Sequence, residues 1–316
     1  MTLSLTFPGQ GSQAIGMGKA LADAYPVAKA VFDEVDDALG EKLSERMWNG
    51  SADELTLTQN AQPALMAVSL AALRVLEAEG LSVGKDVRYV AGHSLGEYSA
   101  LTAAGSLKIA DAARLLRTRG RAMQEAVPVG EGAMAVILGL DLDTVRDVVA
   151  LAAQGGVCEV ANDNAAAQIV VSGEKTAVER AIDIAKSKGA KRSMLLPVSA
   201  PFHCRLMAPA ADVMAEALSS VTIEAPMVPI IANIIAAPID EPHEIRSRLV
   251  AQVAGTVRWR ESMQWMLDHG VNRQIEVGAG KVLTGLIRRM SENLQATSFS
   301  APADLEGARA LWQQEI

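Results

Sequence analysis

The chain has 316 residues and a mass of 33.3 kDa, a length that predicts two domains or one large domain with an insertion. Hydrophobic residues make up 50% of the sequence and charged residues 21%, which allows a sizeable core and excludes a wholly disordered chain. The formal net charge of -8 argues against general binding to nucleic acid or to an anionic membrane.

Cysteine usage and the N-terminus indicate a reducing compartment. The two cysteines, Cys158 and Cys204, and the four histidines make neither a disulfide framework nor a zinc-binding spacing. The N-terminal segment lacks the basic and long apolar regions of a signal peptide, and the most apolar helical window, Ala64–Leu76, is too short to cross a bilayer. We therefore expect a soluble, cytoplasmic protein without a membrane contact.

Strands alternate with helices in the first part of the chain. Short apolar runs predict strands at Leu3–Phe7 and Val87–Ala91. Helical spacing predicts helices within Asp53–Glu79, over Leu95–Ala104 and over Ala110–Val127. This alternation predicts an α/β fold with a mostly parallel sheet and helices on both of its faces.

Between residues 132 and 198 the order of elements becomes β-α-β-β-α-β, the ferredoxin-like arrangement. The predicted elements are Ala133–Leu140, Leu142–Ala153, Val157–Ala161, Gln168–Ser172, Lys175–Ser187 and Ala190–Val198. We expect Asn162-Asp163-Asn164 to join the two middle strands. The predicted domains are therefore a core of residues 1–129 and 199–316 and an inserted ferredoxin-like subdomain of residues 130–198.

The rest of the chain returns to the α/β pattern. Helices are predicted at Cys204–Leu218, Pro242–Val253, Trp259–His269 and Val282–Met290, with an apolar run at Pro229–Ile235. Gln274–Val277 is predicted as the last strand, and the tail from Ser298 is expected to be peripheral.

Residues Gly92 to Gly96 form a G-x-S-x-G motif between a predicted strand and a predicted helix. The glycines allow a sharp turn that presents the hydroxyl of Ser94 to a cleft. The amide of Leu95 then points at the oxygen that becomes negative during acyl transfer. We predict that Ser94 is a nucleophile; the alternative is a glycine-lined turn with a capping serine.

A nucleophilic serine needs a general base, and His203 is the predicted one. It follows a strand at a loop-to-helix junction that can overhang a cleft. His93 lies beside Ser94 with its side chain directed away, His243 is expected on a surface loop, and His269 lies at a helix end. The alternative for His203 is a helix-capping or core histidine.

Two further segments have open interpretations. Phe7–Gln13 is glycine-rich but matches neither a dinucleotide nor a Walker loop, so it is either a second amide donor facing Ser94 or an ordinary turn. Arg117, Arg119 and Arg121 lie on one predicted helix, where at most one or two can face the core. An inward arginine needs an anionic partner; the alternative is a solvated basic face.

Five segments together resemble the malonyl-CoA:acyl carrier protein transacylase family of bacterial fatty-acid synthesis, in the family's order over nearly the whole chain. They are FPGQGSQ at Phe7–Gln13, GHSLGEYSAL at Gly92–Leu101, RTRGRAMQEAVP at Arg117–Pro128, PFH at Pro201–His203 and EVGAGKVLTGL at Glu276–Leu286. The resemblance implies a hydrolase-like core with a ferredoxin-like insert, in agreement with the order of elements.

The resemblance also implies roles for site residues. Ser94 would take the malonyl group from CoA as an ester, and His203 would serve as base and then as acid, without a catalytic carboxylate. The backbone carbonyl of Gln252 would orient His203, and the amides of Gln10 and Leu95 would form the oxyanion hole.

Two positions bear on the choice of acyl group. By the resemblance, Arg119 would bind the free carboxylate of malonyl, which suits a planar, permanently charged guanidinium. Phe202 precedes His203; in related polyketide acyltransferase domains a Phe here accompanies malonyl and a Ser accompanies methylmalonyl. Single-domain bacterial enzymes with Ser also use malonyl, so Phe202 is supporting information only.

The resemblance implies malonyl-CoA and an acyl carrier protein as partners, no cofactor or metal, and a monomer. Because carrier proteins are acidic, we expect a basic rim near the cleft, formed by Lys191, Arg192, Arg205, Lys281, Arg288 and Arg289; scattered solubilising charge is the alternative. The alternative functions are a serine hydrolase or thioesterase, a polyketide acyltransferase for another acyl group, and a non-catalytic carrier-binding module. Asn162, Asn164 and Asn233 receive no role.

Overall fold

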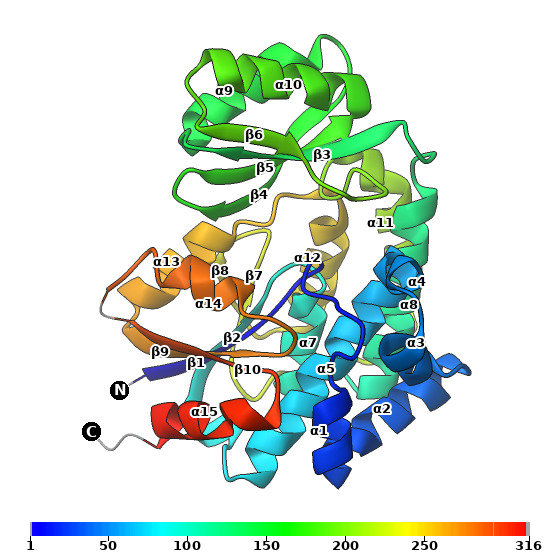
Figure 1. Ribbon diagram of the computed structural model, residues 1–316, viewed down its shortest axis with the longest axis vertical. Helices are drawn as coiled ribbons and strands as arrows, with labels where there is room; N and C mark the ends of the chain where they lie inside the picture. Colours follow the sequence, from blue (N-terminus) through cyan, green and yellow to red (C-terminus); the bar gives the residue numbers. More distant parts are fainter. Residues whose placement is uncertain (1, 293, 314–316) are drawn as a thin grey trace.

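The computed structural model describes residues 2–292 and 294–313. The chain forms a six-stranded and a four-stranded β-sheet, each covered by helices. Figure 1 shows the four-stranded unit, in green, above the remainder of the chain. The expected α/β fold, with a mostly parallel core sheet and a ferredoxin-like unit, is confirmed.

The larger sheet has the strand order β10-β9-β1-β2-β7-β8. Its strands are β1 (Thr2–Phe7), β2 (Val87–Gly92), β7 (Ile230–Ala232), β8 (Ala237–Ile239), β9 (Val271–Val277) and β10 (Gln295–Phe299). Neighbouring strands are parallel except for the pair β7–β8. The segments that follow β1, β2 and β7 therefore emerge at the same edge of the sheet, where ligands bind in open α/β folds.

Helices cover both faces of this sheet. They are α1 (Lys19–Ala24), α2 (Pro26–Leu39), α3 (Leu43–Asn49), α4 (Ala52–Thr56), α5 (Thr58–Ala78), α6 (Val83–Asp86), α7 (Gly96–Ala103), α8 (Ile109–Glu125), α11 (Ala208–Ser219), α12 (Pro242–Ala254), α13 (Trp259–Asp268), α14 (Val282–Ile287) and α15 (Leu305–Trp312), with short 3-10 turns at Arg205–Met207 and Pro302–Asp304. Leu3 and Leu5 pack into the apolar cluster that contains α5, whereas Tyr89 and Ala91 pack into the cluster that contains α13 and α14. This burial on both faces explains why β1 and β2 are short apolar runs in the sequence.

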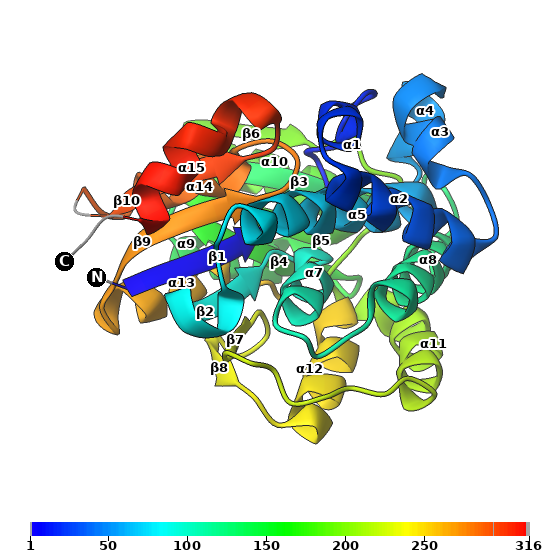
Figure 2. The same ribbon diagram turned by 90° about the horizontal axis from the view of Figure 1, so that it is seen from below.

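Among the described residues, α5 alone has the length and apolar composition of a membrane-crossing helix, with 21 residues and a mean hydropathy of 1.2. The helix is longer than the apolar window Ala64–Leu76, which was expected to be too short to cross a bilayer. Its apolar window is 83% buried inside the protein, and Figure 2 shows it between the larger sheet and α2. The core helix of a soluble protein has the same properties.

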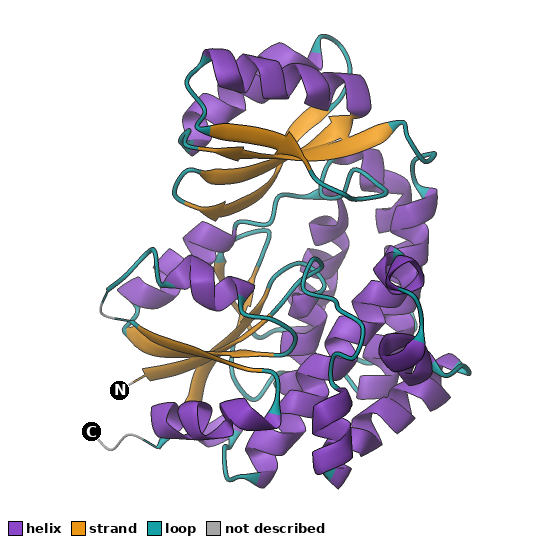
Figure 3. Cartoon of the chain, viewed as in Figure 1, coloured by secondary structure: helices purple, strands orange, loops and turns teal. Residues whose placement is uncertain are grey.

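The smaller sheet is antiparallel and has the order β4-β5-β3-β6. Its unit consists of β3 (Gly132–Leu138), α9 (Leu142–Ala153), β4 (Cys158–Ala165), β5 (Gln168–Glu174), α10 (Lys175–Ser187) and β6 (Arg192–Leu195). Figure 3 shows both helices on the face of the sheet that is turned away from the core. Ala135 and Ile137 pack under these helices, and Met134 on the other face belongs to the main core cluster.

Two expectations about the strands are wrong. Asn162-Asp163-Asn164 lies within β4, because pairing with β5 overrides the turn preference of Asn and Asp; the hairpin turns at Ala167, whose φ is 58°. β9 is not the last strand, since β10 pairs with it at the edge, where a strand needs no continuous apolar run. The long helix expected within Asp53–Glu79 is confirmed as α5, and the short α4 precedes it.

Candidate active site

Ser94 lies in a tight turn between β2 and α7 and has a φ of 53°, a value that side-chain-bearing residues rarely adopt. The flanking glycines make this turn possible. A Cβ on Gly92 would lie 1.8 Å from the carbonyl oxygen of Gly96, and a Cβ on Gly96 would lie 2.3 Å from that of Phe7. The G-x-S-x-G spacing is therefore required by backbone contacts, and the strained residue is the one that presents its hydroxyl to the cavity.

The imidazole of His203 lies next to this hydroxyl, with 2.7 Å between Nε2 and Ser94 Oγ. Nδ1 faces the backbone carbonyl oxygens of Gln252, at 3.0 Å, and Gly255, at 3.2 Å. Carbonyls only accept hydrogen bonds, so Nδ1 carries the ring proton and Nε2 is left to accept the proton of Ser94. The family resemblance implied the carbonyl of Gln252 for this contact, whereas that of Gly255 was not anticipated.

His203 is only 4% exposed. Burial, and after it the positive charge of Arg119, lower the pKa of His203 to about 3. The ring is therefore neutral around pH 7, which is the state that can accept a proton from Ser94.

Arg119, on α8, is the buried arginine of its segment, with 1% exposure. Its Nη1 donates to Gln62 Oε1 at 2.7 Å, and its Nη2 donates to Gln252 Oε1 at 2.9 Å and to Ser94 Oγ at 3.2 Å. Arginine can only donate, so Ser94 Oγ accepts from Arg119 while its own proton is directed at His203. Burial lowers the pKa of Arg119.

These partners of Arg119 are neutral, and its Nε has no hydrogen-bond partner among the described residues. A guanidinium held in this way can bind a carboxylate that enters beside Ser94. Arg117 instead contacts Glu41 and Asn60, and Arg121 is exposed. The three arginines thus take three different environments on one helix.

A cavity of about 580 Å³ lies between the carboxyl edge of the larger sheet and the inner face of the small unit. Ser94, His203 and Arg119 line it together with other polar residues: Gln10, Ser12, Gln13, Thr56, Gln62, His93, Asn162, Asn164 and Gln168. Apolar side chains line much of the remainder: Leu95, Met123, Met134, Val170, Leu196, Val198, Phe202, Leu283 and Leu286. A cavity with both polar and apolar walls suits a ligand that carries polar groups as well as apolar surface.

Gln10 follows β1 and lines the same cavity as Leu95. Its Oε1 accepts a hydrogen bond from Thr58 Oγ1 at 2.8 Å, and Gln62 Nε2 donates to that hydroxyl at 3.1 Å. Through Gln62, this chain of hydrogen bonds links the loop after β1 to Arg119. Thr58 and Gln62 were not anticipated from the sequence, although polar residues on the most apolar helix are a signal for a buried site.

The asparagines left without a role have specific contacts. Asn233, directly after β7, accepts a hydrogen bond from the amide of Ser94 at 2.8 Å. Asn164 Oδ1 and Asn162 Nδ2 lie 2.8 and 3.4 Å from Nε2 of His93. His93 is therefore turned away from the serine hydroxyl, as expected, and it joins the serine turn to β4 of the small unit.

The other expected positions are on the surface. His243 is exposed in the first turn of α12, so its assignment to a loop is wrong, and His269 is exposed at the C-terminal end of α13. The expected basic-rim residues are all exposed, but Arg205 pairs with Glu159. Arg289 donates to Gln168, at 3.2 Å, and Gln168 lines the cavity.

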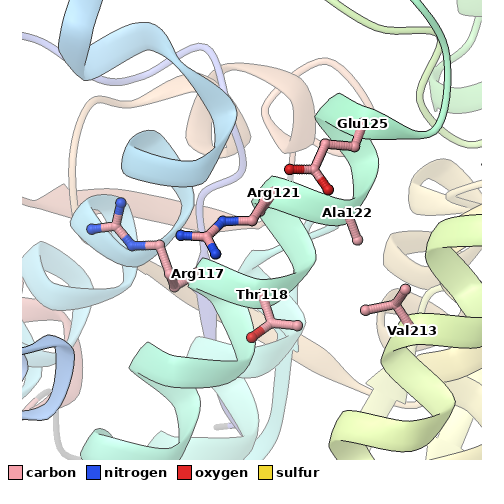
Figure 4. A pocket seen from close by; sticks show the side chains of 6 residues that line it. All are labelled: Arg117, Thr118, Arg121, Ala122, Glu125 and Val213. Atoms are coloured by element: carbon pink, nitrogen blue, oxygen red, sulfur yellow. The ribbon is translucent and has the colours of Figure 1, made fainter.

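A second hollow of about 160 Å³ lies between α8 and α11. Figure 4 shows Arg117, Arg121 and Glu125 along α8, with Val213 opposite on α11. Arg119 is not among its lining residues, because positions two apart on a helix point to different sides. This hollow is separate from the cavity at Ser94.

The model of the acyl transferase domain family matches residues 5–303. The chain belongs to this acyl transferase family. Malonyl CoA-acyl carrier protein transacylases of Bacillus subtilis (strain 168) and Escherichia coli (strain K12) are each 44% identical to it. These alignments cover 99% of this chain and 98% of the first relative, and 98% of this chain and 99% of the second.

Solved structures of acyl transferases agree with this membership. The crystal structure of acyl-carrier-protein-S-malonyltransferase from Bartonella henselae has a TM-score of 0.97 and 55% identity, and covers 99% of this chain and 100% of that chain. A malonyl-transacylase in complex with its type II PKS acyl-carrier protein has a TM-score of 0.95 and 42% identity over 99% of this chain and 100% of that chain. The resemblance to this group of acyl transferases is confirmed.

Proposed function

We propose that this acyl transferase moves the malonyl group from malonyl-CoA to the phosphopantetheine thiol of an acyl carrier protein. The single observation that carries the proposal is the placement of a buried arginine beside a serine–histidine pair. The names of its relatives support the same donor and acceptor.

Ser94 is the proposed nucleophile and His203 the proposed general base. As Ser94 Oγ attacks the thioester carbonyl, its proton passes to Nε2 of His203, and the oxyanion of the tetrahedral intermediate faces the amides of Gln10 and Leu95. Collapse of the intermediate expels the CoA thiolate, which receives that proton. The carrier thiol then gives its proton to His203, attacks the ester and releases Ser94, which takes the proton back.

Arg119 is the proposed receptor for the malonyl carboxylate. A neutral acyl group would leave this buried guanidinium unpaired, at a cost on the order of several kcal/mol. Phe202 lines the cavity beside His203 and is the proposed barrier to an α-methyl group. The chemistry uses protein side chains and two thiols, so the proposal includes no metal and no cofactor.

The carrier protein is proposed to dock at the basic rim. Lys281 precedes Val282, which lines the cavity, and Arg289 contacts the cavity residue Gln168. Lys191 and Arg192 lie where β6 begins, and the segment after β6 reaches the cavity at Leu196. Exposed cations at this place attract an acidic partner in spite of the net charge of -8. We still expect a cytoplasmic monomer. Light scattering of the purified protein tests the expected oligomeric state.

The alternative functions have less support. A hydrolase of the triad type would orient its histidine with a carboxylate, whereas Nδ1 of His203 faces the carbonyls of Gln252 and Gly255. An acyltransferase for a neutral acyl group would not need the buried guanidinium of Arg119, because its substrate has no carboxylate. A module that only binds carriers has no use for a hydroxyl 2.7 Å from an imidazole.

The test is acylation of Ser94 followed by intact-mass spectrometry. Malonyl-CoA should add one malonyl group to the protein but none to Ser94→Ala, and a phosphopantetheine-bearing carrier protein should remove it faster than water does. Labelling by acetyl-CoA in preference to malonyl-CoA would overturn the donor. Discharge to water at the rate of discharge to the carrier would indicate a hydrolase.

A further inference from the structure

Glu97 is a buried carboxylate that the transfer steps do not use. It lies in the first turn of α7, three residues after Ser94, and is 1% exposed. Its Oε2 accepts two hydrogen bonds, from the backbone N–H of Asn233 at 3.0 Å and from Nε2 of Gln252 at 2.8 Å. Burying a carboxylate that contacts only neutral groups costs free energy. The presence of Glu97 at this position therefore needs an explanation.

The first contact leads to the serine turn. The side-chain amide of Asn233 bridges two backbone groups on the N-terminal side of the strained residue: Oδ1 accepts from the amide of Ser94 at 2.8 Å, and Nδ2 donates to the carbonyl of Gly92 at 2.7 Å. Glu97 holds the backbone N–H of the same asparagine. The left-handed φ of Ser94 is therefore supported by an amide whose own position depends on Glu97.

The second contact leads to Arg119. The Gln252 side chain accepts from Arg119 through Oε1 at 2.9 Å, and its Nε2 donates to Glu97 and to the carbonyl of Ser94 at 3.0 Å. Arginine can only donate and an ionised carboxylate can only accept, so the amide has a single possible orientation. Without Glu97, Nε2 loses its shortest acceptor and keeps the carbonyl of Ser94, so the amide is held less firmly against Arg119.

We propose that Glu97 is a positioning residue for acyl transfer: one carboxylate oxygen orients Asn233 and Gln252, and these two amides hold the turn of Ser94 and the guanidinium of Arg119. Glu97 acts through these residues and does not reach the acyl group. The inference rests on the proposed function for its substrate, but the contacts around Ser94 do not depend on which acyl group is carried.

The charge of Glu97 is consistent with this geometry. Burial raises its pKa to about 7, and the hydrogen bonds from Gln252 and Asn233, together with the charge of Arg119, hold it below the value that burial alone would set. The groups that Glu97 orients are thus the groups that stabilise its ionised form.

Two substitutions separate the acceptor oxygen from the bulk of the side chain. In Glu97→Gln, the amide oxygen can take the place of Oε2 and accept both hydrogen bonds. Glu97→Leu has a similar volume and no acceptor. Thr102→Val is a matched control, because Thr102 is buried on the same helix and its hydroxyl donates to the carbonyl of Tyr98, not to the site.

The measurement is the rate at which a neutral fluorophosphonate labels Ser94, followed by intact mass, together with kcat and KM for malonyl transfer. Loss of alignment in Glu97→Leu should lower the labelling rate and kcat by about 100-fold, while Glu97→Gln stays within about fivefold of the parent protein. Thr102→Val should label at the parent rate. Rapid labelling of Glu97→Leu, or Glu97→Gln as slow as Glu97→Leu, overturns the proposal.

Glu97→Asp keeps the proposal testable if Glu97→Leu does not fold. It retains the charge but withdraws the oxygen by one methylene, so labelling should slow by about tenfold, and parent-like labelling overturns the proposal. Because the fluorophosphonate carries no malonyl group, a parent protein that is labelled by it but not by malonyl-CoA refutes the proposed donor and leaves the test of Glu97 intact.

Discussion

The guanidinium of Arg119 donates a hydrogen bond to the hydroxyl oxygen of Ser94 at 3.2 Å. The same oxygen lies 2.7 Å from Nε2 of His203. Arg119 therefore has two consequences for the proposed chemistry: it directs the serine proton toward His203, and it places a positive charge within reach of an acyl group attached to Ser94. The second consequence is specific to an acyl group with a free carboxylate.

Replacing Arg119 with Ala should lower kcat/KM for malonyl transfer by about 100-fold or more, because the malonyl carboxylate loses a buried, charge-assisted partner. Acetyl transfer should fall much less or improve: loss of the hydrogen bond to Ser94 affects both acyl groups, but a neutral group no longer leaves a buried cation unpaired. Steady-state kinetics with malonyl-CoA and acetyl-CoA measure both effects. Unchanged selectivity for malonyl would contradict the role of Arg119.

Arg121→Ala is the matched control for this substitution. Arg121 lies on the same helix but is exposed and lines the smaller hollow against α11. Its removal should leave the malonyl-to-acetyl ratio at the parent value.

Gln62→Leu should raise KM for malonyl-CoA by about tenfold, because the guanidinium of Arg119 loses the acceptor of its Nη1 group and no longer holds one orientation. Fluorophosphonate labelling of Ser94 should change little, since Gln62 contacts neither Ser94 nor His203. Ser69→Ala is the control, because Ser69 is buried on the same helix and its hydroxyl has no hydrogen-bond partner among the described residues. Equal effects of the two substitutions would refute the specific role of Gln62.

The low pKa of His203 predicts an unusual pH dependence. Since His203 becomes protonated only near a pKa of about 3 rather than 6.5, the acylation rate should show no loss with a midpoint near pH 6.5. Single-turnover acylation between pH 5 and 8, measured by intact mass, checks this expectation. Because the pKa of Glu97 is about 7, Glu97→Gln is measured in parallel. An inflection near pH 6.5 that persists in Glu97→Gln would contradict the neutral, buried ring.

The same residue links stability to pH. Between pH 3 and 6.5 the unfolded chain binds a proton at His203 that the folded protein does not, so this contribution to stability falls as the pH falls. Glu97 acts in the opposite sense: its pKa is raised from 4.5 to about 7, so its contribution falls as the pH rises through that window. Melting temperatures of the parent and of His203→Gln should therefore converge on acidification, and parallel curves would contradict the prediction.

An ion pair joins the small unit to the core. Asp163 on β4 is 2% exposed at its side chain and lies 2.7 Å from Arg260 on α13. Arg260→Leu leaves that carboxylate buried and unpaired, so the free energy of unfolding should fall by about 3 kcal/mol. Urea denaturation measures the change.

Glu261→Gln is the control for the ion pair. Glu261 pairs with Arg258 at side-chain exposures of 31% and 38%, and loss of such a surface pair should cost less than about 1 kcal/mol. Similar losses in the two variants would show that the contact between β4 and α13 contributes no more than a surface pair.

Much of the fold could be predicted because local signals agree with the tertiary structure. The bounds of α9 and α10 match the predicted helices, and Asp141 caps α9 by accepting from the amide of Thr144. The tail was harder to predict because β10 is an edge strand, whose alternating polar residues resemble a loop. The turn preference of Asn162-Asp163-Asn164 was misleading because strand pairing outweighed it.

The residues of the candidate site show the same difference between local signals and contacts between distant segments. Ser94 was found from its flanking glycines, since the requirement for a tight turn acts between neighbours in the sequence. Before the family resemblance was considered, His203 could also be a helix-capping or core histidine, and Arg119 could also belong to a solvated basic face. Their meeting point depends on contacts between distant segments, which composition and spacing do not encode.

The sequence by itself therefore determined the elements and the serine turn, because backbone geometry and hydrophobic periodicity depend on residues that are near in the chain. Only the tertiary structure decided that Gln62 holds Arg119 and that Glu97 and Asn233 support the turn of Ser94. It also decided that Gln252 contacts Ser94 with its side chain and His203 with its backbone carbonyl. The physical reason is that a buried polar group is satisfied by whichever partner the fold brings to it, and here parallel strands bring their carboxyl ends to one edge.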